Sequence, residues 1–232
     1  MPAERLDSAI VRRQLRWMVG HPSAVLLGGQ LAAVLGYPFL DENPVGRAVL
    51  GVVGMALVLI AIWAVRLTPV LRWVAVLLGA PAMVLTVLEA LSPSTDWIVI
   101  TSALWHAPFY FYVSYAMIQY LFHDDKVTRD ELFATGAAFT VVAWGFAYVF
   151  SGVEAVWPGS FTATGDVGWY ELLFLSFANL TSVGLSDVLP VLEHARSVVM
   201  VEQVVGVLYV ALVVARLVGL TVVRATNDRT GS

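Results

Sequence analysis

Long apolar runs separated by short polar stretches dominate the chain. A membrane-spanning helix needs about 20 mostly apolar residues. Six runs reach roughly that length, at about residues 22–40, 45–65, 69–91, 97–122, 132–153 and 197–223. Between the last two lies Trp169–Leu180, an apolar run of only about a dozen residues, which suits a re-entrant helix. The pattern predicts an all-α membrane protein with six transmembrane helices and one re-entrant helix.

Composition agrees with a bilayer as the solvent. Hydrophobic residues make up 59% of the chain and charged residues 13%, whereas soluble domains carry about 25% charged residues. The net charge of −4 and the lack of a basic cluster argue against a nucleic-acid partner. The chain has no cysteine, and it holds no Ser-His-Asp set, phosphate loop or metal-binding carboxylate pair in a plausible arrangement. We therefore expect neither an enzyme nor a bound cofactor.

The basic residues fix the expected orientation. Only Arg47 and Arg196 fall on one side of a six-span arrangement. The other side carries Arg5, Arg12, Arg13, Arg16, Arg66, Arg72, Lys126, Arg129, Arg224 and Arg229. The positive-inside rule then predicts a multi-pass protein of the cell (plasma) membrane with both termini in the cytoplasm.

A charged stretch at residues 123–131 divides the chain, and Thr128 followed by Glu131 fits a capping box for the fifth helix. This stretch is either a solvated connection or a linker that transmits force to the last two spans. The expected parts are a cytoplasmic N-terminal segment, a four-helix domain, a cytoplasmic linker, a two-helix unit and a short cytoplasmic tail. They cover residues 1–21, 22–122, 123–131, 132–224 and 225–232. We expect no soluble ligand-binding domain.

The segment Thr181–Pro190 reads T-S-V-G-L-S-D-V-L-P and joins the short apolar helix to the last long one. Irregular backbone at membrane depth is tolerated only where it lines water or is buried in protein. Rings of backbone carbonyls can replace the water shell of an ion, and a Ser or Thr hydroxyl can add one more oxygen ring. Glycine serves where carbonyls must turn inward at positive φ.

This segment resembles the filter of the potassium-channel superfamily, T-x-V-G-Y-G-D-x-x-P. The run Phe174–Phe177 with Leu180-Thr181 resembles the pore helix of that superfamily. Similarity to the inner helix of bacterial six-span members follows in Ala195–Ser197, Glu202, Gly206, Leu208-Tyr209 and Val214–Gly219. The resemblance covers roughly residues 127–220, and spans one to four share only number and arrangement with the family. It implies a two-helix pore unit with a filter loop and a homotetrameric channel in membrane lipid.

The resemblance also assigns roles by position. Thr181 is the expected pre-filter threonine, and Ser182 supplies the innermost hydroxyl ring. Asp187 matches the acidic residue behind the filter, and we expect Glu171 and Asn179 to support it. The carbonyls that would bind K⁺ belong to Ser182, Val183, Gly184 and Leu185.

Two residues depart from the family filter. Leu185 replaces an aromatic residue that braces the filter, and Ser186 replaces the second glycine. A non-glycine residue at positive φ costs about 1 kcal/mol or more. Either Ser186 takes this strain, or the outer filter relaxes and loses its outermost carbonyl ring. We expect the second, with weaker selectivity for potassium over sodium.

The fourth span, 97–122, carries no arginine, so the usual voltage sensor is absent. It holds His106, which is either a hydrogen-bonded histidine near the outer interface or a titrating functional group. His194 and Glu193 lie beside the expected outer mouth, where sensing of external pH is an option.

The last helix carries further candidates. Glu202 could pair with Asn179. Gly206 and Arg216 are candidates for gating, Gly206 as a bend or as a close packing contact against the pore helix. For Arg216 we favour snorkelling to the interface or pairing with an aspartate at position 124, 125 or 130.

The sequence thus predicts a passive cation channel that conducts K⁺ through a carbonyl-lined filter with reduced selectivity. One alternative is a non-selective monovalent cation channel that also passes Na⁺. Another is a non-conducting membrane sensor or scaffold with a degenerate pore.

Overall fold

The computed structural model describes residues 21–40, 44–64, 69–92, 95–122 and 129–230. Its elements are α2 (Pro22–Leu40), α3 (Pro44–Ala64), α4 (Pro69–Leu91), α5 (Asp96–Leu121), α6 (Arg129–Val156), β1 (Phe161–Thr162), α7 (Trp169–Leu180), β2 (Leu189–Pro190) and α8 (Glu193–Thr230). Residues 1–20 and 123–128 lie outside the described part, and so does Thr128 of the expected capping box.

The helices follow the apolar runs closely. The short helix α7 has the predicted bounds, whereas α8 is longer than its apolar run and continues to Thr230. In the described ranges, four helices are long and apolar enough to cross a membrane: Pro22–Leu40, Trp73–Leu91, Asp130–Val156 and Glu193–Arg216. The protein is therefore an all-helical, multi-pass membrane protein. The count of six spans stays a prediction.

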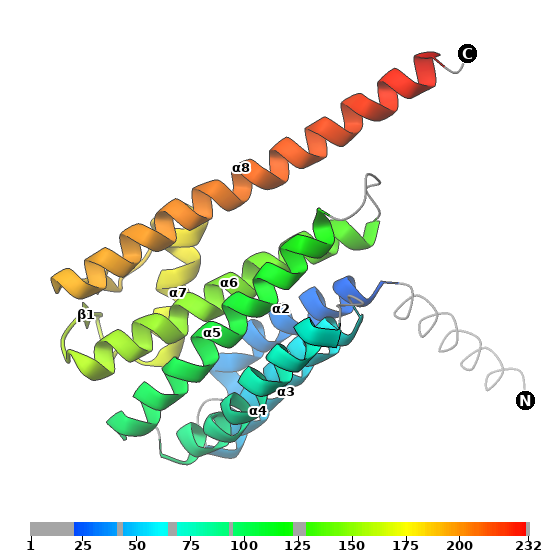
Figure 1. Cartoon of the computed structure of the whole chain (residues 1–232). Coiled ribbons are helices and arrows are strands. Elements are labelled where there is room, and N and C mark those ends of the chain that lie inside the picture. The colour runs from blue at the N-terminus through cyan, green and yellow to red at the C-terminus, as the bar shows by residue number, and fades with distance from the viewer. Residues whose placement is uncertain (1–20, 41–43, 65–68, 93–94, 123–128, 231–232) are drawn as a thin grey trace, which may run out of the picture.

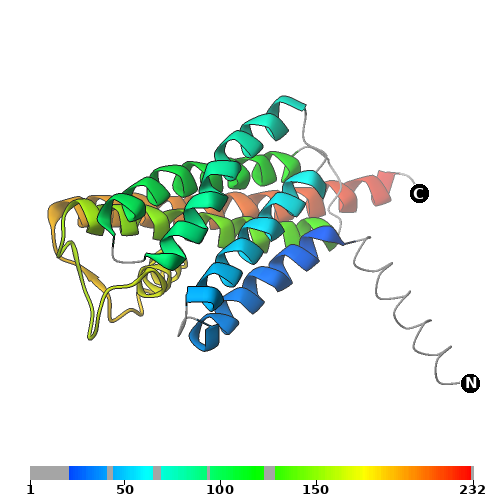
Figure 2. The same cartoon turned by 90° about the horizontal axis from the view of Figure 1, so that it is seen from below.

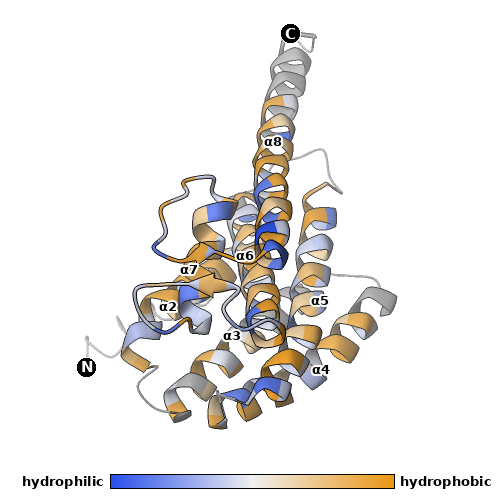
Figure 3. Ribbon diagram, turned by 90° about the vertical axis from the view of Figure 1, so that its left-hand side faces the viewer, coloured by the Kyte–Doolittle hydropathy of each residue, from blue (hydrophilic) through white to orange (hydrophobic). Residues whose placement is uncertain are grey.

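Two groups of helices share α6. Helices α2 to α5 form a bundle in sequence order, and both α5 and α2 pack against α6 (Figures 1 and 2). Helices α7 and α8 also pack against α6, and α8 extends past the bundle toward the C-terminus (Figure 1). Most of the coloured ribbon is apolar, with few hydrophilic residues within the helices (Figure 3), as expected for helices in lipid.

The core centres on α5 and α6. Phe109, Val113, Val141 and Phe150 are fully buried, together with small residues such as Ala137 that let the helices approach. A smaller cluster joins α6, α7 and the start of α8. These contacts attach both the four-helix bundle and α7 to α6, and Tyr37 of α2 also stacks on Tyr170 of α7 with ring centroids 4.5 Å apart.

A short antiparallel pair of strands was not predicted. Phe161 pairs with Pro190 and Thr162 pairs with Leu189. The backbone N–H of Val191 also donates to Ser160 O at 2.8 Å. Both carboxylate oxygens of Glu154 accept backbone N–H groups, from Gly159 at 2.7 Å and from Phe161 at 2.9 Å. The loop before α7 is thereby tied to the chain after Thr181–Ser186.

Candidate ion pathway

The re-entrant helix α7 starts at a cap that its own sequence supplies. The Glu171 carboxylate accepts the Gly168 backbone N–H at 3.0 Å. Acidic residues in the first turn also interact favourably with the helix dipole. Glu171 therefore lies at the start of α7, opposite the end that leads into Thr181. Its expected role as a support of the filter has no counterpart in these contacts.

Hydrogen bonds join the last turn of α7 to the segment that follows it, which begins at Thr181. Thr181 N–H and its hydroxyl both donate to Phe177 O, at 3.1 and 2.6 Å. Ser182 N–H donates to Asn179 O and Gly184 N–H to Ala178 O, both at 2.9 Å. These bonds satisfy carbonyls that the last turn of a helix leaves open.

The same bonds orient carbonyls of the segment. The N–H and C=O of one trans peptide point in opposite directions. Since Gly184 N–H points at α7, the Val183 carbonyl points away from α7, and by the same argument so does the Thr181 carbonyl. The side chains of Val183 and Leu185 are 70% and 74% exposed in the single chain. Apolar side chains of this size that are uncovered in the single chain are expected to pack against another molecule.

Left-handed backbone occurs at alternate residues. Ser182 has φ of 59° and Gly184 has φ of 69°, and Ser182 is the one non-glycine residue with positive φ in the described part of the chain. Ser186 therefore does not take the strained conformation. Its hydroxyl instead accepts the Val188 backbone N–H at 3.1 Å. Val188 is fully buried and anchors the end of the segment, next to the exposed Asp187.

A buried carboxylate lies behind this segment. Glu202 of α8 is fully buried, and its Oε1 accepts a short hydrogen bond from Ser176 of α7. Ser176 Oγ is also 2.8 Å from the Ala143 carbonyl of α6. Asn179, the partner expected for Glu202, is buried and its side chain interacts with the Glu202 carboxylate, although no hydrogen bond of regular geometry joins Asn179 Nδ2 to Glu202 Oε2. Ser176 was missed in the sequence because its position on the buried face of a short helix gives no signal.

Gly206 is a contact point between α8 and the end of α7. A Cβ added there would lie 2.2 Å from the Leu180 carbonyl oxygen. The helix continues through Gly206 as one element. Of the two alternatives raised by the sequence, the structure has the close packing contact and no break in the helix.

Arg216 pairs with Glu131, which the sequence did not suggest as a partner. Its Nη2 lies 3.5 Å from Glu131 Oε2, and its guanidinium lies 5.0 Å from the ring centroid of Phe122. Asp130 instead accepts the backbone N–H and the hydroxyl of Ser23, at 3.1 and 2.8 Å. Residues 124 and 125 lie outside the described part. Arg216 therefore links α8 to the beginning of α6.

The two histidines differ in setting. His106 is fully buried in the bundle, with Nε2 2.8 Å from Thr86 Oγ1 and Nδ1 2.9 Å from Ser102 O. His194 is exposed and stacks on Trp157 at 4.1 Å, at the end where the loops around α7 gather. His106 thus matches the hydrogen-bonded alternative.

A short helix inserted between two long apolar helices, followed by backbone whose carbonyls turn outward, defines a membrane protein of the pore-forming class. Residues 136–222 match the model of a family described as Ion channel. This match confirms the resemblance to the potassium-channel superfamily over residues 136–222. The family consists of ion channels and not of enzymes, as expected. No curated protein and no solved structure matches the chain.

Proposed function

We propose that the chain forms a homotetrameric, passive cation channel of the potassium-channel type. The observation that carries this proposal is the segment after α7, whose N–H groups bond back to α7 and turn the Val183 carbonyl toward an uncovered face. One copy cannot surround an ion, because a filter needs carbonyls on all sides. Four copies around an axis would complete the rings at Ser182, Val183, Gly184 and Leu185.

The uncovered surface of α8 supports the same assembly. Large apolar side chains on this helix are more than half exposed: Met200, Val201, Val204, Val207, Leu208, Leu212, Val214 and Val218. Lipid can cover part of this surface and other subunits the remainder. In this arrangement α2 to α5 form a peripheral scaffold without voltage-sensor arginines, and both termini lie in the cytoplasm.

Ser186 favours a second candidate, a non-selective monovalent cation channel. The left-handed alternation at Ser182 and Gly184 does not continue to Ser186. Without it, the outermost ring would lack the regular carbonyl geometry that strips water from K⁺. This second candidate shares the pore with the first and differs only in how well it discriminates K⁺ from Na⁺.

Ion flux into liposomes that contain the purified protein tests the proposal. Gly184→Ala should reduce cation flux at least tenfold, because alanine is strained at φ of 69°. Gly165→Ala is the matched control, since an added Cβ meets nothing within 4 Å and φ is not positive there. Absence of flux in the unmodified protein at every pH and membrane tension would instead support a non-conducting scaffold.

Bi-ionic reversal potentials then separate the two candidates. Ser186→Gly should shift the K⁺/Na⁺ reversal potential toward stronger potassium selectivity, because glycine can resume the left-handed alternation. A reversal potential that is already strongly potassium-selective in the unmodified protein would contradict the relaxed outer ring.

A further inference from the structure

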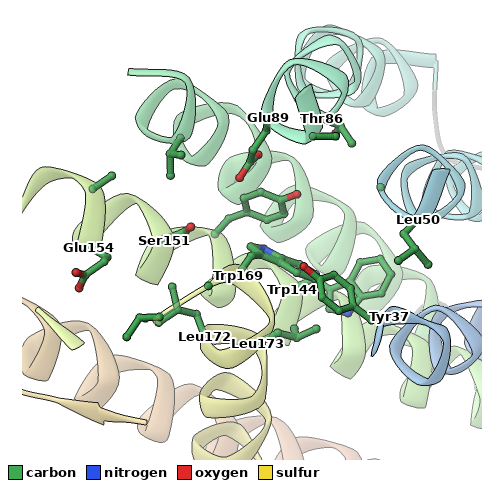
Figure 4. Close-up of a pocket in the computed structure, with 18 of the residues that line it drawn as sticks. Tyr37, Leu50, Thr86, Glu89, Trp144, Ser151, Glu154, Trp169, Leu172 and Leu173 are labelled. Carbon is green, nitrogen blue, oxygen red and sulfur yellow. The ribbon is translucent and has the colours of Figure 1, made fainter. Parts of the chain in front are cut away.

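A cavity of about 500 Å³ lies between the four-helix bundle and the first turn of α7 (Figure 4). Side chains from α2, α3, α4, α5, α6 and α7 line it. Its volume falls within the range of small-molecule sites, about 300–1,000 Å³. It is separate from the ion pathway, because Thr181–Ser186 lies at the other end of α7.

Aromatic side chains form much of the cavity wall. Tyr37, Trp144 and Trp169 lie together on one side (Figure 4), and Tyr110 and Tyr148 complete the set. Trp169 lies 5.7 Å from Tyr37 and 5.6 Å from Tyr148, measured between ring centroids. The indole nitrogens of Trp144 and Trp169 are buried and have no hydrogen-bond partner within the described residues. Aromatic faces attract cations as well as apolar groups.

The charges in the cavity have one sign. Glu89, Asp96 and Glu154 line it, and none of the lining residues that the structure describes is Lys, Arg or His. Glu154 uses both oxygens for the loop before α7. Glu89 uses Oε2 to accept the Ser102 hydroxyl at 2.5 Å, and its carboxylate points toward the aromatic side chains (Figure 4). Of Glu89 and Glu154, Glu89 is thus the carboxylate better placed for an occupant.

A rigid set of contacts holds both the carboxylate and the aromatic wall. Ser102, which bonds Glu89, is also 3.0 Å from His106 Nδ1. The His106 ring stacks on Tyr148 with centroids 4.2 Å apart and planes 8° apart. The buried His106 therefore supports the Glu89 carboxylate through Ser102 and the aromatic wall of the cavity through Tyr148. Such a preformed site loses little conformational entropy when it binds a ligand.

We propose that this cavity binds a small amphipathic organic cation, with its ammonium group at Glu89 and its apolar part on Tyr37, Trp144 and Trp169. An anion would face three carboxylates without a basic partner. A lipid tail would leave Glu89 without a counter-charge at membrane depth, which is costly. A bare metal ion would not use the aromatic wall, and the described residues contain no cluster of three metal-ligating side chains.

Binding of radiolabelled benzyltrimethylammonium to the full-length protein in lipid nanodiscs tests this proposal. Its uncharged isostere, neopentylbenzene, serves as a competitor. We expect Glu89→Gln to weaken binding about tenfold or more, because the amide keeps the acceptor for Ser102 but removes the charge. We expect Ala33→Phe, which fills the cavity from α2, to weaken it similarly, and neopentylbenzene to compete poorly.

Asp187→Asn is the matched control, since it removes a carboxylate at the predicted outer mouth of the pore. It should leave binding within about twofold of the unmodified protein. Loss of binding in Asp187→Asn with full binding in Glu89→Gln would place the cation in the ion pathway and overturn the proposal. Equal competition by neopentylbenzene would overturn it too, because the cavity would then recognise only apolar matter. The assay measures no ion flux, so its result does not depend on whether the protein conducts.

Discussion

The four-helix bundle and the pore unit use buried polar groups in different ways. In the bundle, Glu89, Ser102, His106 and Thr86 bond to one another across α4 and α5. In the pore unit, Ser176 and Glu202 join α7 to α8, while apolar side chains at Val183 and along α8 stay uncovered. The polar side chains of this bundle network thus bond to one another. At the contact of α7 with α8, by contrast, Glu202 Oε2 and Asn179 Nδ2 make no hydrogen bond of regular geometry with the described residues.

This difference separates two kinds of mutation. A change in the bundle network should alter the stability of each chain without changing the ion pathway. A change at the contacts of α7 with α8 should alter the pathway itself, because those contacts hold the segment after α7. Four experiments test this distinction, from the largest expected effect on stability to the smallest.

His106→Ala should lower the free energy of unfolding by about 2–4 kcal/mol, since it removes a buried ring, its hydrogen bonds and its stacking on Tyr148. Thermal unfolding in detergent measures the loss, and ion flux per folded protein should not change. His194→Ala, at an exposed stacked histidine, should change stability by less than about 0.5 kcal/mol. A selective loss of flux in His106→Ala would show that the bundle controls the pathway directly.

Gly206→Ala should destabilise the protein by up to about 3 kcal/mol and reduce flux, because the added methyl meets the Leu180 carbonyl oxygen and pushes α8 from α7. Gly219→Ala is the matched control on the same helix, since its Cβ meets nothing within 4 Å. It should be neutral or slightly stabilising, as alanine favours a helix. Equal effects of the two substitutions would refute the packing role of Gly206.

Ser176→Ala should cost about 1.5 kcal/mol, because Glu202 then loses its donor while it stays buried. The effect should appear in flux or selectivity as well as in thermal unfolding, since Ser176 lies in the helix that leads into Thr181. Ser197→Ala provides the control, because that exposed hydroxyl bonds only to the backbone of its own helix, at Glu193 O, 2.9 Å away. Unchanged ion currents in Ser176→Ala would limit this contact to stability.

The pair of Arg216 and Glu131 should contribute the least, with a coupling energy of about 0.5 kcal/mol, since 3.5 Å is a long contact and membrane hydrogen bonds average about 0.6 kcal/mol. A double-mutant cycle with Arg216→Gln and Glu131→Gln measures it. If the pair also holds the channel closed, each single substitution should raise the fraction of open time. Additive effects of the two substitutions would rule out direct coupling.

Some features followed from the sequence because they depend on neighbouring residues. Apolar run length located the helices, and the abrupt change from Leu180 to Thr181-Ser182-Val183-Gly184 marked the end of α7. Gly184 takes positive φ, as expected of the glycine in this segment. Ser182, also at positive φ, was not expected there, because the bonds from Ser182 and Gly184 to the end of α7 set this conformation.

Other features depended on residues far apart in the chain. For Arg216 the sequence favoured snorkelling or pairing with an aspartate at position 124, 125 or 130, whereas the rotation of α6 presents Glu131 to it. Glu171 was expected to support the filter, and it lies in the first turn of α7, at the end of the helix opposite Thr181. The rotation of a helix about its axis and the direction in which it runs decide which side chain makes a contact. Neither can be read from the local composition of the sequence.

The sequence by itself determined a membrane protein with a short re-entrant helix, because hydrophobic run length is set by the thickness of the bilayer. It also determined the place of the irregular backbone after Leu180. Only the tertiary structure decided that Ser176 and Glu202 meet, that Gly206 lies against Leu180, and that an acidic aromatic cavity separates the bundle from α7. These features arise where helices that are distant in sequence pack together. Which side chains meet there depends on the rotation of each helix about its axis and on the angle at which the helices cross, and not on how apolar the helices are.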